Sequence, residues 1–154
     1  MKSSRKRSIE ILLLEINQNI EEYADITVKK MFEEKDFDFL CYPPNCGFTE
    51  LEKQELLKLQ DNEHLKNALR KVIANSSAGI VFDIFCLTDG VGCPKNDYEN
   101  WTGLRIVNVE DIDEKILIEG VLEEVYLHDE FFEKYWDWKA IRGNKTWKLD
   151  TYDD

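Results

Sequence analysis

The sequence lacks an uninterrupted apolar run of the roughly 18–20 residues that a membrane span needs. It also lacks an excess of basic charge, because 32 acidic residues stand against 20 basic ones and give a formal net charge of −12. Nucleic acids and anionic membrane surfaces both attract basic proteins. We therefore expect a protein that uses neither nucleic acid nor membrane as a partner.

The N-terminus lacks the features of an export signal. Basic residues at positions 2–7 precede an apolar run, but Glu10 and Glu15 interrupt that run. No small-residue cleavage site follows it. We expect a cytoplasmic protein of the bacterial type.

Residues that bind metals are few. The chain has two histidines and four cysteines, Cys41, Cys46, Cys86 and Cys93. These cysteines are the thiol candidates for a zinc site, but structural zinc pairs usually lie about two to four residues apart, and the separation of Cys86 from Cys93 is wider. In a reducing cytosol we expect free thiols and no cofactor.

The length and composition indicate a globular protein. A chain of 154 residues that is 43% hydrophobic matches one folded domain, so we expect a single domain over residues 1–154. No family motif, internal repeat or low-complexity segment is recognisable in it. Its function must therefore be inferred from pattern and charge alone.

The first third of the chain has helical periodicity. Apolar residues from Ile9 to Tyr23 recur every three or four residues, which predicts a helix over about 5–35 with one apolar stripe. The β-branched residues at 25–28 leave open whether this is one long helix or two successive ones. A loop rich in proline follows at 41–47.

Two further helices are predicted before residue 88. Thr49 and Glu52 match a capping box, which predicts a helix over about 50–59. Asp61 is the expected cap of the next helix, about 62–87. Its second half is apolar nearly all round, which is typical of a helix in the centre of a domain. A strand over 80–87 is the alternative, since the residues there are β-branched and aromatic.

The remaining sequence favours strands and one more helix. Residues 104–109 and 115–119 predict an antiparallel hairpin, and 121–127 a third strand, so the expected small sheet spans about 104–127. Asp129 is the expected cap of an aromatic helix over about 130–142, which Gly143 ends. The predicted fold class is α+β.

Acidic charge is concentrated near the C-terminus, where residues 96–154 hold sixteen acidic and seven basic groups. One interpretation is a solvated surface that keeps the protein soluble. The other is a recognition face for a basic protein, with carboxylates that speed association and aromatic rings that anchor the complex. The expected contact residues are Trp101, Asp111, Asp113, Glu114, Tyr135 and Trp138.

The aromatic helix carries two stripes of rings. Phe131, Tyr135 and Trp138 form one, and Phe132 and Trp136 form the other. One interpretation is core packing against the predicted hairpin. The other is that a partner or a second subunit covers the outer stripe, because a monomer of this size does not easily bury both. We expect a non-catalytic protein-binding module, such as a toxin-neutralising immunity protein or another inhibitor of a basic partner.

Two other functions stay open. A small enzyme would use Asp83, Asp89 and His128, because a carboxylate within an apolar run and a histidine can together move protons. A structural homodimer would use the apolar stripe from Ile9 to Tyr23.

Overall fold

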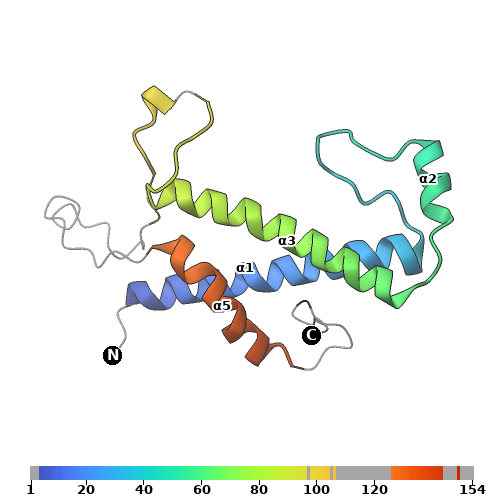
Figure 1. Cartoon of the computed structure of the whole chain (residues 1–154), viewed down its shortest axis with the longest axis horizontal. Helices are drawn as coiled ribbons and strands as arrows, with labels where there is room; N and C mark the ends of the chain where they lie inside the picture. The colour runs from blue at the N-terminus through green and yellow to red at the C-terminus, as the bar shows by residue number, and fades with distance from the viewer. Residues whose placement is uncertain (1–3, 97, 105, 107–125, 144–148, 150–154) are drawn as a thin grey trace, which may run out of the picture. The chain divides into compact units, whose positions relative to one another are not determined.

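The computed structural model describes residues 4–96, 98–104, 106, 126–143 and 149. Its elements are α1 (Ser4–Lys29), the π-helical turn η1 (Lys30–Glu34), α2 (Glu50–Leu57), α3 (Glu63–Thr88), the 3-10 turn η2 (Tyr98–Asn100) and α5 (Leu127–Ile141) (Figure 1). The chain divides into two compact units. Among the described residues, unit 1 holds 4–18, 77–96, 98–104, 106 and 126–143, and unit 2 holds 19–76 and 149. The expected single domain stays a prediction.

The predicted α+β fold class is wrong, because the described residues contain helices and no strand. Leu104 and Ile106, at the start of the predicted hairpin, are irregular and exposed. Leu127, the expected end of the third strand, is the first residue of α5. A β-branched pattern indicates a strand only where neighbouring strands pair with it. The rest of the predicted sheet, residues 107–125, lies outside the described residues.

The predicted helices agree with the observed ones to within a few residues. α1 runs without a break through 25–28, and the chain leaves the helical conformation at Lys35, which has a φ of 51°. The capping box of α2 is confirmed, with the side chain of Thr49 accepting from the Glu52 N–H. α3 is capped by Asn62 rather than by Asp61, since Asn62 Oδ1 accepts from the Leu65 N–H at 3.1 Å.

The buried line of α1 differs from the predicted apolar stripe. Tyr23, which the stripe included, is 67% exposed. The fully or nearly buried positions are Leu13, Asn17, Glu21, Ala24, Val28 and Phe32, spaced by three or four residues. This line includes two polar residues, so the inner face of α1 is set by its neighbours as much as by its own hydrophobicity.

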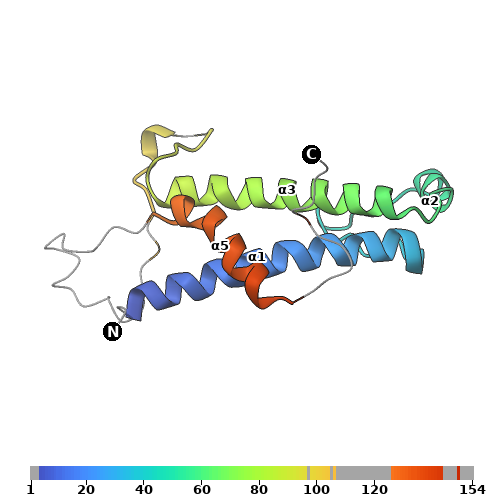
Figure 2. The ribbon, with the colours of Figure 1, turned by 60° about the horizontal axis from the view of Figure 1, so that its bottom comes forward.

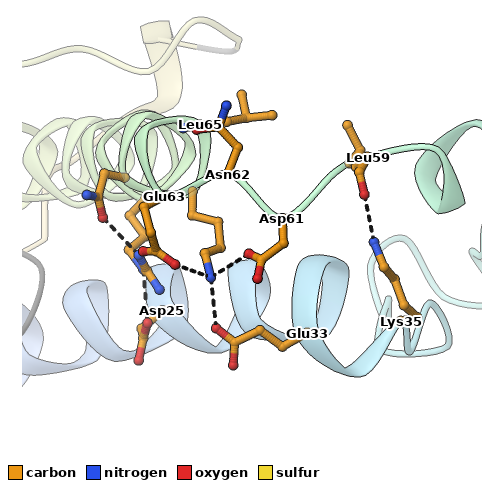
Figure 3. Close-up of polar contacts among 11 residues, drawn as sticks. Asp25, Glu33, Lys35, Leu59, Asp61, Asn62, Glu63 and Leu65 are labelled. Atoms are coloured by element: carbon orange, nitrogen blue, oxygen red, sulfur yellow. Dashed lines mark hydrogen bonds and ion pairs between the residues drawn. The ribbon is translucent and has the colours of Figure 1, made fainter.

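Unit 2 is held together by ion pairs that join α3 to α1, to η1 and to the loop between α2 and α3 (Figure 3). Lys66, on α3, is 4% exposed, and its Nζ lies 2.5 Å from Glu63, 2.9 Å from Asp61 and 3.3 Å from Glu33. The hydrogen bonds that the Lys66 ammonium donates to these carboxylates raise its pKa above its ordinary value. One turn further on, Arg70 Nε donates to Asp25 Oδ1 at 3.0 Å. Pairing of this kind is what allows long basic side chains to lie inside.

In unit 1, α5 packs against the first part of α1 and the last part of α3 (Figure 2). Phe131 is 1% exposed and meets the ring of Phe85 edge-on, with centroids 5.6 Å apart. Leu13 and Leu127 are also buried. Asn17 is also buried. Its side-chain amide donates to Leu13 O at 2.9 Å and to Phe131 O at 3.4 Å. This small core fixes which side of α5 faces outward.

The second half of α3 is more exposed than its composition predicts. Phe85 is buried, but Ile80 is 64% exposed and Ile84 is 50% exposed. The expected central helix is therefore apolar on both its covered and its open side. Among the described residues, α3 is the one helix that is long and apolar enough to cross a membrane, by length and composition alone. Only 11% of its apolar 18-residue stretch is buried.

Candidate partner-binding surface

The outer stripe of α5 leaves two large aromatic rings of unit 1 open to solvent. Phe132 is 55% exposed and Trp136 is 56% exposed, and they lie one helical turn apart. Inward packing of the neighbouring Phe131 leaves these two rings on the open side. Of the other stripe, Phe131 is buried and Tyr135 and Trp138 are half-buried. That a partner or a second subunit covers the outer stripe stays a prediction.

Neighbouring side chains hold both exposed rings. The ring of Phe132 stacks on Phe82 of α3, with centroids 5.3 Å apart and an interplanar angle of 30°. Trp136 meets Tyr135 edge-on at 5.3 Å, and the ammonium of Lys139 lies 5.1 Å from its ring centroid. Rings that are already positioned lose little conformational freedom when a partner covers them.

A row of carboxylates follows the exposed rings along α5. Asp129, Glu133 and Asp137 recur every four residues and are all exposed. Asp129 lies 3.3 Å from the Nε2 of His128, and Asp137 pairs with Lys134 at 2.8 Å. Exposed pairs of this kind contribute about 0–1 kcal/mol, so the carboxylates can exchange these contacts for others. We call Phe132, Trp136, Asp129, Glu133 and Asp137 the aromatic–acidic face.

The expected contact residues lie elsewhere. Tyr135 and Trp138 belong to the inner part of α5 and are only partly exposed. Trp101 is also partly exposed, in the loop after η2. Asp111, Asp113 and Glu114 lie outside the described residues. The spacing of the two stripes contained the signal for Phe132 and Trp136, but the sequence did not show which stripe faces inward.

Asp89 and His128, two of the three expected enzymatic residues, come together in unit 1. His128 Nδ1 lies 2.7 Å from Asp89 Oδ2, and the same oxygen accepts from the His128 backbone N–H at 2.8 Å. The rings of Phe82 and Tyr126 meet the imidazole edge-on at 6.1 and 5.8 Å. The third residue, Asp83, is exposed on α3 and is not part of this pair.

The nearest candidate nucleophile lacks the activation that covalent catalysis needs. Burial and then the charges of Asp83, Asp89 and Asp129 raise the pKa of the Cys86 thiol. A reactive cysteine needs a lowered pKa. The Asp89–His128 pair joins the end of α3 to the start of α5.

No metal site is found within the described residues. The cysteines Cys41, Cys46, Cys86 and Cys93 are all free thiols. No group of three or more His, Cys, Asp or Glu side chains in this part of the chain has a geometry that holds a metal ion. His64, the other histidine, is exposed at the start of α3.

Comparison of the chain with protein-family models, with curated proteins and with solved structures returned no match.

Proposed function

We propose that this protein is a non-catalytic binding module for a basic protein partner, and that the aromatic–acidic face of α5 is its contact surface. The observation that carries the proposal is the exposure of Phe132 and Trp136, each more than half open, directly beside a row of exposed carboxylates. Monomeric proteins rarely leave adjacent large rings open to water unless a partner covers them.

The two kinds of side chain have different parts in binding. Fully covering a ring such as Phe132 contributes about 1.5–3 kcal/mol, and aromatic side chains are frequent energetic centres of interfaces. The carboxylates attract basic side chains over a distance and raise the association rate. The position of Lys139 near the ring of Trp136 supports a partner arginine or lysine at the same ring.

The overall charge supports an inhibitor of a basic protein. A net charge of −12 complements a protein that itself binds a polyanion, such as a nuclease toxin with a basic substrate groove. An immunity protein that covers such a groove is the concrete form of this proposal. Cytoplasmic location belongs to the same proposal.

The experiment uses three tagged forms of the full chain in its native host. The wild type, the double variant Phe132→Ser/Trp136→Ser and the control Ile141→Ser are purified, and the bound proteins are identified by mass spectrometry. Ile141 is 66% exposed and lies one helical turn beyond Asp137, without being one of the five residues of the face, so it controls for loss of an exposed apolar residue at the edge of the face. We expect a basic protein with the wild type and the control, and its loss from the double variant.

Two results would contradict the proposal. Recovery of the same proteins with all three forms would mean that the face makes no contact. A doubled mass in solution that the double variant loses would assign the face to a second copy of this chain. Sedimentation at several concentrations distinguishes these results.

A further inference from the structure

α2, in unit 2, is a helix that buries none of its eight residues. Leu51 is 74% exposed and Leu57 is 55% exposed. Helices this short are marginal in water and normally depend on burying one face. Here the capping box holds the first turn, so the helix is already formed while its apolar side chains remain open.

One side of α2 forms an apolar groove. Its lining residues are Phe48, Leu51, Glu52, Glu55, Leu56 and Leu59, and its volume is about 470 Å3. The ring of Phe48 makes edge-on contacts with the rings of Phe37 and Phe39, with centroids 6.3 and 6.2 Å apart. The groove therefore has an apolar floor and two carboxylates among its lining residues. Its volume lies within the ~300–1,000 Å3 that is usual for binding sites.

Both carboxylates are available as charges. Glu52 accepts from the Thr49 N–H at 2.7 Å, and this bond lowers the pKa of the Glu52 carboxyl, so it is ionised at neutral pH. Glu55 forms an exposed pair with Lys58. A surface pair of this kind is weak and can be exchanged for a partner's cation.

We propose that this groove binds an amphipathic segment of a basic protein, with an apolar side chain against Phe48 and Leu51 and a lysine or arginine beside Glu52 and Glu55. The class of partner rests on the proposed function, but the site lies on the other unit and on separate residues. Charge complementarity selects this occupant. A second copy of the chain would bring the same negative charge of −12, and an anionic lipid surface would be repelled.

The test uses a fluorescein-labelled amphipathic peptide of leucine and lysine, and a matched peptide with glutamate in place of lysine. Both are titrated with the full chain carrying Phe132→Ser/Trp136→Ser, which removes the α5 face from the measurement. Fluorescence anisotropy gives the dissociation constants. We expect the lysine peptide to bind, and the glutamate peptide to have a dissociation constant at least about tenfold higher. A tenfold difference is on the order of the free energy of one charge-assisted contact.

Two leucines of α2 provide a matched pair of variants. Leu51 lines the groove and Leu57 does not, although both are more than half exposed. We expect Leu51→Ser to weaken lysine-peptide binding about tenfold, the effect of one apolar contact, and Leu57→Ser to change it less than about twofold. Glu55→Gln should weaken binding and reduce its salt dependence. Circular dichroism of each variant shows whether the helices remain.

Equal effects of Leu51→Ser and Leu57→Ser would overturn the groove as the site. Equal binding of the two peptides would overturn the basic character of the occupant. Self-association that Leu51→Ser removes would assign the groove to a second copy and overturn the proposal in the same way. The native partner distinguishes the two proposals. If Phe132→Ser/Trp136→Ser loses the partner and Leu51→Ser retains it, the groove alone is refuted. If both variants retain the partner, the proposed function is refuted.

Discussion

One oxygen of the Asp89 carboxylate contacts both the backbone N–H and the ring Nδ1 of His128. The backbone N–H of His128 lies 2.8 Å from Asp89 Oδ2, and the ring Nδ1 lies 2.7 Å from it. Both contacts are hydrogen bonds when the Asp89 oxygen accepts and Nδ1 carries a hydrogen. His128 is the second residue of α5, so its N–H is one that the helix itself leaves unbonded. Asp89 is therefore an N-terminal cap supplied from the end of another helix.

This relationship predicts that Asp89→Ala destabilises unit 1 by about 1–3 kcal/mol. The change leaves the His128 N–H without its acceptor, and the carboxylate lost has a side chain only 8% exposed. The measurement is the midpoint of urea unfolding followed by tryptophan fluorescence. Asp83→Ala is the control, because Asp83 is exposed on the same helix and should change stability by no more than about 0.5 kcal/mol. Equal midpoints for the two variants would contradict the capping role.

Removing the two adjacent phenylalanines of α5 should lower the stability of the protein by different amounts. Phe131→Ala should cost about 3–5 kcal/mol, because the ring is 1% exposed and its removal leaves a cavity against Phe85. Phe132→Ala should cost only about 0.5–1.5 kcal/mol, since the ring is half open and loses mainly its stacking on Phe82. Thermal unfolding of the two variants measures the difference. A larger cost at Phe132 would mean that the two stripes of α5 are reversed.

Local signals in the sequence were sufficient for the helices. The capping box at Thr49 and Glu52 acts over three residues, so no knowledge of the rest of the chain was needed. Gly143, which was expected to end α5, has a φ of 72°, a conformation that favours glycine. The predicted start of α5 is three residues too late, because its cap is Asp89 and not the nearby Asp129.

The burial of polar residues could not be predicted from local sequence signals. Lys66 and Arg70 are buried because Glu33 of η1 and Asp25 of α1 pair with them, and pairings between distant positions leave no periodic pattern. The same ambiguity reversed the expectation for Ile80, which is apolar but exposed. Which stripe of α5 is free depends likewise on Phe85 and Asn17, which no local pattern connects to it.

The capping box makes the helicity of α2 depend on pH. The Thr49 N–H lowers the pKa of Glu52 below its ordinary 4.5, so the bond stabilises α2 above that pH and is lost as the pH falls through the lowered value. We expect the Cα chemical shifts of α2 to be helical at pH 7 and to lose helical character below about pH 4.5. Glu52→Gln should remove this dependence, and Glu55→Gln, outside the box, should retain it. Identical pH profiles for both variants would contradict the assignment.

Thr49→Ala tests the same box from its other side. It removes the acceptor of the Glu52 N–H and should lower the stability of α2 by about 1 kcal/mol. Because α2 buries no side chain, the loss should appear as local fraying and not as global unfolding. Amide hydrogen exchange measures it, with faster exchange in α2 and unchanged exchange in α1. Uniformly faster exchange would show that α2 supports the rest of unit 2.

The four thiols should differ in reactivity in an order that their surroundings set. Cys41 and Cys93 are exposed, whereas burial and the nearby carboxylates raise the pKa of Cys86 and reduce its thiolate fraction. At pH 8 we expect iodoacetamide to modify Cys41 and Cys93 first and Cys86 several-fold more slowly, as followed by mass spectrometry of the digested protein. Asp83→Asn should accelerate only Cys86, because it removes one of the charges that raise its pKa. Adding a chelator should change none of the rates, and a chelator that accelerated all four would mean that the thiols had held a metal.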